Sequence, residues 1–325
     1  MFVPHTFGLA LLMMIVSALC WGSWANTYKG TRSYRFELFY WDYAIGIVLT
    51  ALLLGLTLGS VHSDGTNLTA NVHAADWSNI GYALVAGVVF NVANLLLVAG
   101  IDMAGLAIAF PVSIGIALVV GVTSSYIQQP RGDAKLLAAG VALAIAAIVM
   151  DGLAYAQVGG PRQASRKSLV VCVISGLLMG SFAPLVAHAM SRGVPLGPYS
   201  VAVFYTLGAL LCCFVANVYL MRKPLAGEPV DFRGYFSAGT TNHVLGLVGG
   251  GIWCLGTVFN FVAASLTGVA ISYCIGQAAP MVAAAWGVFV WKEFKGAGPR
   301  AKLYLTLMFV FYILAIVLVS LAYRG

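Results

Sequence analysis

The chain has 325 residues, of which 61% are hydrophobic and only 8% are charged, and its mean hydropathy is +0.94. Soluble domains carry about 25% charged residues, so this composition excludes an ordinary soluble domain. The formal net charge is +7. The sequence therefore predicts an all-α membrane protein that crosses the bilayer several times.

Ten apolar segments of about 20 residues follow one another along the chain, the length that a helix needs to cross about 30 Å of hydrocarbon. The first is expected to be a mature helix, because no basic residue precedes it and no small-residue cleavage site follows it. Short connections predict antiparallel neighbours, and the longest connection, 61–78, is expected to be an exposed loop. The segments are 6–27, 37–60, 79–100, 103–126, 134–153, 168–190, 199–221, 243–264, 268–291 and 301–323.

The positions of Lys and Arg predict the orientation. Thirteen of the 17 basic residues fall in or beside the connections after the odd-numbered segments, and four fall on the opposite side. By the positive-inside rule, both termini lie outside and the central connection 159–167 lies in the cytoplasm. Basic residues in these positions face anionic lipid, so the net charge does not require a nucleic-acid partner.

Several function classes lack the residues that they need. The six cysteines lie inside apolar segments without CxxC spacing, and the five histidines are scattered, so no metal site and no cofactor is expected. An enzyme would need a converging nucleophile and base, and a channel would need a repeated pore motif or charged rings. The pattern favours a transporter.

The chain also resembles itself. Residues 17–25 (SALCWGSWA) match residues 175–183 (SGLLMGSFA) at an offset of 158, and residues 105–110 (GLAIAF) match 268–273 (GVAISY) at an offset of 163. A third match, VFN at 89–91 and 258–260, would require the connection before the ninth segment to be six residues shorter than its counterpart.

These matches predict two five-helix repeats, 1–158 and 159–325, in one membrane domain. Five is an odd number, so the second repeat must be inverted relative to the first. Inverted repeats are typical of secondary transporters, whose substrate site lies near the bilayer midplane between the repeats.

Small and polar residues in the repeated motif suggest two roles. Close helix packing is expected at Gly22, Ser23, Gly180 and Ser181. Trp24 and Asn26 carry polar groups that are costly in hydrocarbon unless they face protein, water or a solute. For Trp24, an interfacial anchor is the alternative.

Amides deeper in the segments suggest a site for an uncharged solute, because an amide offers donors and an acceptor together. The alternative for each is a hydrogen bond between helices. With aromatic residues that could stack the solute, the expected cavity residues are Trp24, Asn26, Asn91, Asn94, Trp253, Asn260, Tyr273 and Gln277.

Asp42 is the intramembrane carboxylate that the sequence singles out. It lies between aromatic residues more than one turn inside the second segment, where burial disfavours the charged form, so it is a candidate carrier of a coupled proton. The alternative is an ion pair with Lys29, Arg32 or Arg35. Local ion pairs are expected for Glu37 and Glu293.

Several motifs together resemble the drug/metabolite transporter superfamily. They are WGSW at 21–24, FYWDY at 39–43 and WGVFVWKEF at 286–294. Within that superfamily the chain is most similar to bacterial relatives of ureide permeases and of glucose/ribose porters. The aspartate at position 42 matches a Leu-Asp-Tyr-like element of the ureide permeases.

The resemblance implies a secondary active importer of the bacterial inner membrane, without cofactor. Its substrate would be a small neutral ureide or nucleobase of the allantoin, uracil and xanthine class, coupled to protons or to sodium, with a pentose or hexose as the alternative. Plant ureide permeases carry a long central loop with a nucleotide-binding-like motif, which this chain lacks, so ATP binding does not follow. A monomer and a homodimer both fit the pattern.

Overall fold

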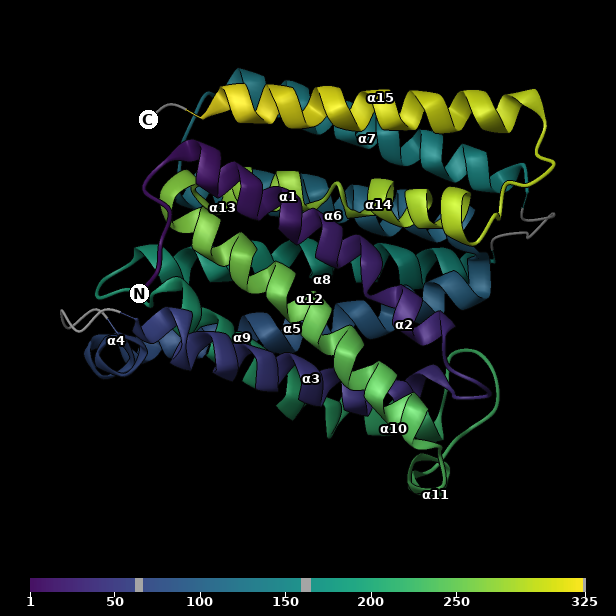
Figure 1. The fold of residues 1–325 in the computed structure, drawn as a ribbon, viewed down its shortest axis with the longest axis horizontal. Coiled ribbons are helices and arrows are strands. Elements are labelled where there is room, and N and C mark those ends of the chain that lie inside the picture. Colours follow the sequence, from purple (N-terminus) through teal and green to yellow (C-terminus); the bar gives the residue numbers. More distant parts are fainter. Residues whose placement is uncertain (62–66, 159–164, 324–325) are drawn as a thin grey trace.

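The computed structural model describes residues 1–61, 67–158 and 165–323. In these ranges the regular structure is helical, and ten helices are long and apolar enough to cross a membrane, which confirms the predicted fold class. The spans lie roughly along one axis in a single bundle (Figure 1). The first five are α1 (Phe7–Ser23) with α2 (Ala25–Lys29), α3 (Phe36–Leu56) with the turn η1 (Leu58–Ser60), α5 (Trp77–Ala104), α6 (Leu106–Gln128) and α7 (Ala134–Ala156).

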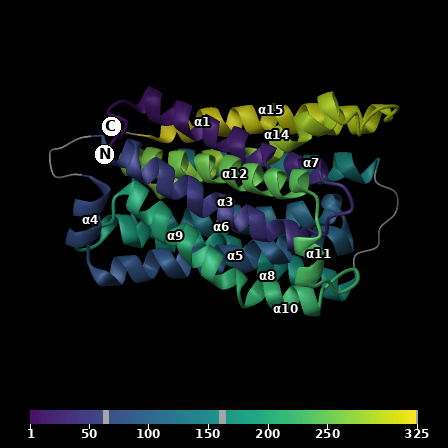
Figure 2. The ribbon, with the colours of Figure 1, turned by 60° about the horizontal axis from the view of Figure 1, so that its bottom comes forward.

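The second group of five spans begins after the central connection. It comprises α8 (Arg166–Ser191), α9 (Pro198–Cys213) with α10 (Ala216–Arg222), α12 (Thr240–Thr267), α13 (Val269–Gly276) with α14 (Ala279–Ala285) and the π-helical turn η2 (Trp286–Val290), and α15 (Pro299–Ala322). Two short helices, α4 (Leu68–Ala74) and α11 (Phe232–Phe236), lie at the ends of the bundle (Figure 2).

Two expected segments differ in detail. The connection 61–78 is not wholly a loop, because α4 forms there behind an N-cap in which the Asn67 side chain accepts from the Ala70 amide at 2.8 Å. The ninth span is not one continuous helix, since Gln277 and Ala278 leave helical geometry between α13 and α14. This break lies at the cavity described below.

The exterior of the bundle is apolar. Large hydrophobic side chains such as Leu49, Leu53 and Leu314 are exposed along the helices, as expected of surfaces that face lipid. The interior side of the spans is filled largely by small residues and aromatic rings, and small residues let membrane helices approach closely.

Helix pairing follows the predicted repeat. The first span packs on α12 as α8 packs on α5, α3 packs on α12 as α9 packs on α5, and α7 packs on α15. Helices α5 and α12 each have 28 residues, and each ends at a glycine in the left-handed region, Gly105 with φ 79° and Gly268 with φ 86°. These correspondences are consistent with two inverted repeats.

The structural register corrects one of the three sequence matches. Each of the two glycines leads directly into the next helix, so the connection after α12 is not six residues shorter than that after α5. At the common offset of 163, Phe90 corresponds to Trp253 and Asn94 to Thr257. The pairing of Asn91 with Asn260 was therefore wrong.

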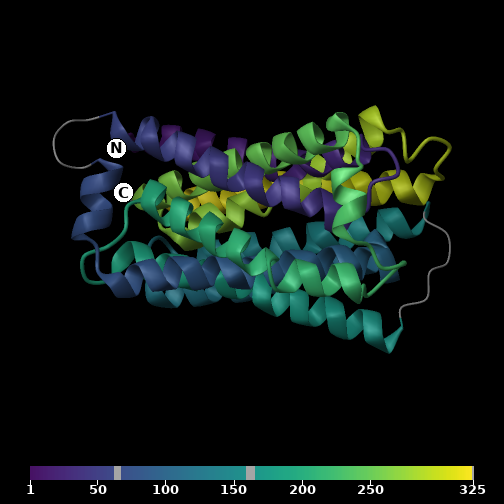
Figure 3. The same ribbon diagram turned by 90° about the horizontal axis from the view of Figure 1, so that it is seen from below.

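Both termini lie at the same end of the bundle, whereas α2, α10 and α11 lie at the opposite end (Figures 1 and 3). We call these the terminal end and the basic end, because the second carries Lys29, Arg32, Arg35, Arg222 and Lys223. An even number of spans requires this placement of the termini.

Candidate functional site: a central cavity

A cavity of about 350 Å³ lies in the bundle and takes its lining from both halves of the chain. Its volume falls in the range of small-molecule pockets. The floor is formed near the middle of the spans by Phe90, Met179, Phe182 and Trp253, and the mouth lies at the basic end, beside Lys29, Asp102, Tyr155, Trp291 and Glu293.

Aromatic rings dominate the inner part of the cavity. The Trp253 ring stacks on Phe90 with centroids 4.5 Å apart and planes at 24°, and Trp21 lies 6.3 Å from Trp253 at 19°. Trp24 packs at a tilt on Tyr43 at 4.8 Å. These packed rings offer flat faces held in place by their neighbours, which suits a planar solute.

Two amides add the polar groups of the inner cavity. The Asn94 side chain is 5% exposed and donates through Nδ2 to the Tyr40 hydroxyl at 3.1 Å, which leaves its amide oxygen as the acceptor for a solute. Gln277 is 8% exposed and lines the cavity. It lies at the break between α13 and α14.

Five of the eight predicted cavity residues line the cavity: Trp24, Asn26, Asn94, Trp253 and Gln277. The other three do not line it. Each lies behind the lining and has a polar atom that contacts a neighbouring group, although Asn91 Nδ2 has no partner among the described residues. Asn91 accepts from Tyr40 at 2.9 Å, Asn260 donates to the Ser272 carbonyl at 2.9 Å, and the Tyr273 hydroxyl lies 3.5 Å from the Met179 carbonyl.

Other lining residues were not among the predicted ones, notably Phe90 and Phe182. Phe90 shares a helical face with Asn94, Leu97, Val98 and Ile101, which all line the cavity. The spacing of four residues between Phe90 and Asn94 was the signal that could have found it. For Phe182, the signal was its match to Trp24 at the offset of 158.

Three of the four small residues of the repeated motif, Gly22, Ser23 and Gly180, lie at contacts with another helix. A Cβ atom on Gly22 would lie 2.4 Å from the Ala279 carbonyl oxygen, and one on Gly180 would lie 2.9 Å from that of Ala117. Ser23 accepts from the Trp286 indole at 2.9 Å, whereas Ser181 donates to the Leu177 carbonyl within its own helix.

A plug of rings closes the cavity toward the terminal end. Phe182, Tyr205, Phe261 and Tyr273 contact one another with centroids 5.6 Å apart. Further out, Arg131 packs on Gly268 and donates to the carbonyls of Ser265 and Leu266 at 3.3 and 3.0 Å. Among the described residues, the cavity is therefore closed toward the terminal end and open toward the basic end.

The mouth is held by a polar network. Lys29 forms an ion pair with Glu293, whose second oxygen accepts from the Tyr155 hydroxyl at 3.2 Å. Asn26 accepts from the Trp291 indole at 2.6 Å and donates to the Ser23 carbonyl. Both polar atoms of the Asn26 amide therefore bind residues at the mouth. The predicted ion-pair role of Glu293 is confirmed, and its partner Lys29 comes from the other half of the chain.

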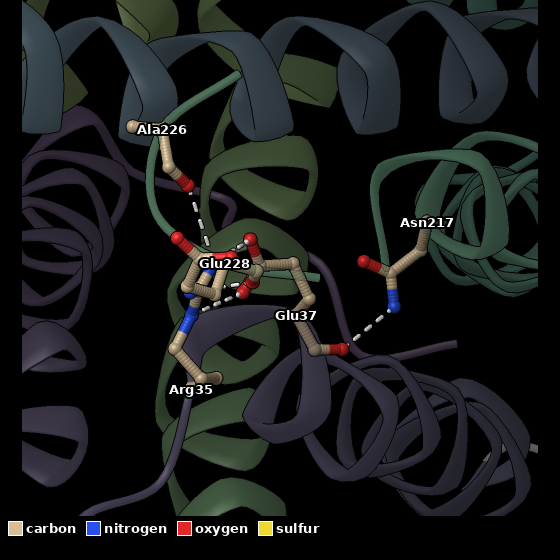
Figure 4. Close-up of polar contacts among 5 residues, drawn as sticks. All are labelled: Arg35, Glu37, Asn217, Ala226 and Glu228. Carbon is tan, nitrogen blue, oxygen red and sulfur yellow. Dashed lines mark hydrogen bonds and ion pairs between the residues drawn. The ribbon is translucent and has the colours of Figure 1, made fainter. Parts of the chain in front are cut away.

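A second ion pair fixes the start of α3. Arg35 donates to Glu37 at 2.6 Å and to the carbonyls of Ala226 and Glu228, while Asn217 donates to the Glu37 carbonyl (Figure 4). The hydrogen bond to Glu37 raises the pKa of Arg35. The predicted local role of Glu37 is confirmed, and the contacts tie the connection after α10 to α3.

Asp42 lies outside the cavity lining and is 3% exposed. It accepts from the hydroxyls of Tyr34 at 3.1 Å and Tyr235 at 2.7 Å, and His243 Nδ1 lies 2.9 Å from the carboxylate. Burial, and then the carboxylate itself, raise the pKa of Tyr34 and of Tyr235, so both stay neutral donors. The alternative, an ion pair of Asp42 with Lys29, Arg32 or Arg35, is not among the ion pairs of the described residues, in which Lys29 and Arg35 bind glutamates.

Known proteins resemble this chain over nearly its whole length. A sequence profile described as ureide permease matches residues 39–168 and 162–322. Ureide permease 1 of Arabidopsis thaliana is 20% identical over 381 residues, covering 97% of each chain. Ureide permease 5 of the same plant is 22% identical over 392 residues, covering 97% of this chain and 94% of the relative.

One solved crystal structure superposes with a TM-score of 0.61 at 18% sequence identity, over 95% of this chain and 96% of the other, which shows a shared fold. The ten spans surround an aromatic cavity of a size that suits a small molecule. The matching profile and the relatives are permeases, which makes the protein a membrane transporter rather than an enzyme. With the profile matching most of its length, the chain belongs to the ureide permease family.

Proposed function

We propose that this protein imports a small, planar, neutral ureide or nucleobase by alternating access of its two five-helix repeats, 1–158 and 159–325. The observation that carries the proposal is the inner cavity, in which Trp253, Trp24 and Phe90 offer ring faces while Asn94 and Gln277 offer amide groups. A planar solute with ring N–H and carbonyl groups would stack on the indoles and pair with the amides.

The same cavity is less suited to a sugar. A pentose or hexose carries a hydroxyl on nearly every carbon, and each buried hydroxyl without a partner costs free energy. The inner lining offers few polar side chains beyond Asn94 and Gln277, and the charged lining residues lie at the mouth. The names of the Arabidopsis relatives point to the same substrate class.

Coupling to protons through Asp42 is part of the proposal. The carboxylate is buried in the membrane-spanning part of α3 and contacts His243 of α12, so one proton can be shared between them. Because α3 and α12 belong to different repeats, loading and release of that proton would accompany movement of the repeats against each other.

The distribution of basic residues supports an orientation in the membrane and an inward-open conformation. With the basic end in the cytoplasm, as the positive-inside rule requires, the cavity would be open inward and both termini would lie outside. We place the protein in the inner membrane of a bacterium, as a member of the drug/metabolite transporter superfamily, on the basis of its resemblance and its paired five-helix halves.

Uptake by the purified protein in liposomes tests this function. Labelled uracil, allantoin, xanthine, ribose and glucose are offered separately, each with and without an imposed pH gradient and then with a sodium gradient. We expect the heterocycles to accumulate when the outside is acidic and the sugars to stay at the level of empty liposomes.

The Trp253→Ala variant tests whether the solute binds in the central cavity. It removes the central ring face and should lower heterocycle affinity by about three- to tenfold, the equivalent of one aromatic contact.

The uptake assay has three outcomes that would contradict the proposal. Sugar uptake in place of heterocycle uptake would assign the protein to the sugar porters. Accumulation driven by sodium alone would overturn proton coupling, and uptake of none of the five would overturn the substrate class.

A further inference from the structure

Asp151 is a second carboxylate inside the membrane-spanning part of the bundle, five residues before the end of α7. Its side chain is buried, with 3% of its surface exposed. The oxygen Oδ1 has no hydrogen-bond partner among the described residues, and none of the ion pairs found in that part of the chain includes Asp151. In this respect it is the opposite of Asp42, whose oxygens bind three side chains.

The surroundings of Asp151 supply neutral groups rather than a cation. Helix α7 packs on α15 (Figure 1), from which Tyr312 interacts with Asp151, and the buried Tyr312 hydroxyl likewise lacks a partner among the described residues. From α6, Ala107 and Pro111 contact the adjacent Gly152. Helix α14 has no titratable side chain, and Arg300 and Lys302 at the start of α15 are exposed.

A buried carboxylate without a cation or donors is far more stable protonated than ionised, because the charged form loses its hydration and gains nothing in return. Inside a membrane, such a residue marks a functional site by default. Hard metal cations require several oxygen ligands, and the described residues hold no group of three His, Cys, Asp or Glu side chains that could bind one. A proton requires only one acceptor.

A chain of groups connects Asp151 to the cavity mouth. Tyr155 lies one turn further along α7, on the same helical face as Asp151, and lines the mouth. Its hydroxyl donates to Glu293 at 3.2 Å, and Glu293 binds Lys29. Gly287 permits this approach, since a Cβ atom there would lie 2.7 Å from a Glu293 oxygen and 3.0 Å from the Tyr155 hydroxyl. Gly287 belongs to the π-helical turn η2, a feature frequent at functional sites.

We propose that Asp151 is a second intramembrane proton-binding site, occupied in the inward-open state and connected to the cytoplasmic mouth through Tyr155 and Glu293. This inference rests on the proposed transport function. Release of the proton through Tyr155 and Glu293 to water leaves an ionised Asp151 carboxylate. That product is stabilised only when water or a donor reaches the carboxylate, so release is linked to movement of α7 against α15.

Transport assays in liposomes test the role of the proton. Asp151→Asn keeps the size of the side chain and removes the proton site. We expect this variant to exchange labelled for unlabelled substrate across the membrane as the unchanged protein does, but to concentrate substrate less under a pH gradient, because Asp42 alone then carries a coupled proton. Tyr155→Phe should slow gradient-driven uptake without abolishing it. Glu228→Gln, which changes an exposed carboxylate in the connection after α10, is the matched control and should accumulate substrate normally.

Infrared difference spectra between acidic and alkaline buffer test the site itself, whatever the substrate is. Protonated carboxyl groups show a carbonyl stretch that shifts in heavy water. Asp151→Asn should remove one such component, Asp42→Asn should leave that component in place, and Glu228→Gln should leave it unchanged. Gel filtration and thermal unfolding establish that each variant is folded.

The two assays separate the possible failures. If the unchanged protein transports none of the solutes, the proposed function fails, while the infrared component lost in Asp151→Asn still establishes the proton site. If Asp151→Asn accumulates substrate normally, or if its infrared spectrum matches that of the unchanged protein, Asp151 is not the proposed site. If Asp151→Asn does not fold, Asp151→Glu is tested instead. This variant should retain the infrared carbonyl component at a shifted frequency. A folded Asp151→Glu protein without the component overturns the proposal.

Discussion

Asn94 and Asn91 lie three residues apart on α5, yet their environments differ. Asn94 lines the cavity, whereas Asn91 lies behind it and accepts from Tyr40 at 2.9 Å. The Tyr40 hydroxyl connects the two amides, since it also accepts from Asn94. Asn91 therefore positions Tyr40 and Asn94 rather than touching a solute.

This difference gives a prediction at the residue scale. Asn94→Ala and Gln277→Ala should each raise the Kd for substrate about two- to tenfold, the effect of one lost neutral hydrogen bond. Asn91→Ala should change substrate affinity less than Asn94→Ala and should lower thermal stability more. Ligand-dependent quenching of tryptophan fluorescence gives the affinities, and thermal unfolding in detergent gives the stability. Equal affinity losses at Asn91 and Asn94 would contradict the geometry of the lining.

A second prediction at the residue scale concerns Asp42 and its partner His243. Asp42→Asn should abolish concentration of substrate under a pH gradient while leaving exchange between labelled and unlabelled substrate, because Asp42 does not line the cavity. His243→Gln should weaken gradient-driven uptake in the same assay. An Asp42→Asn protein that still concentrates substrate would exclude the carboxylate as the coupling site.

At the scale of helices, close contacts depend on glycine. Gly22 faces the Ala279 carbonyl and Gly180 faces Val120 and Ala117, so the first span and α8 each approach a neighbour at these positions. A side chain there would force the helices apart, whereas Gly115 on α6 has no atom within 4 Å of an added Cβ.

We therefore expect Gly22→Val and Gly180→Val each to destabilise the protein by about 1–3 kcal/mol, the usual cost of overpacking. Gly115→Ala is the control and should be neutral or stabilising by up to about 1 kcal/mol, because alanine favours the helix. Thermal unfolding in one detergent compares them. If both valine variants unfold at the same temperature as the unchanged protein, the helices can move apart at these contacts with little loss of stability.

Arg131 gives a second prediction at the helix scale. Its guanidinium donates to two carbonyls at the end of α12, where a cation is also favoured by the helix dipole. Arg131→Gln removes the charge and should shift the protein toward the state that is open at the terminal end, by about 0.3–1 kcal/mol. Faster labelling of a cysteine introduced at Met190, beside Arg131 in a pocket at the terminal end, would reveal the shift, and unchanged labelling would refute it.

At the scale of the whole molecule, the orientation can be measured directly. Ala74 is exposed on α4 at the terminal end, and Glu228 is exposed at the basic end. A membrane-impermeant maleimide should label Ala74→Cys on intact cells and Glu228→Cys only after permeabilisation. Five of the native cysteines are buried and Cys20 is half-buried, so the unchanged protein provides a low background. The reverse pattern would overturn the positive-inside assignment.

The sequence by itself determined the class of protein and most of its spans. Runs of apolar residues must form helices in a bilayer, because backbone groups there have no water to bind. Repeated motifs indicated the paired halves, and five of the eight expected residues line the cavity. Local pattern sufficed for these features because hydrophobic length and helical spacing are properties of short segments.

The tertiary structure alone decided which polar groups face the cavity and which are already bound. Asn91, Asn260 and Asp42 are polar residues within apolar segments, as Asn94 is, but their partners come from other helices and lie up to 243 residues away in the chain. Asp151 differs from Asp42 for the same reason, since no side chain among the described residues forms a hydrogen bond with its Oδ1. A sequence shows which groups must be satisfied, and only the packing of distant helices supplies or withholds their partners.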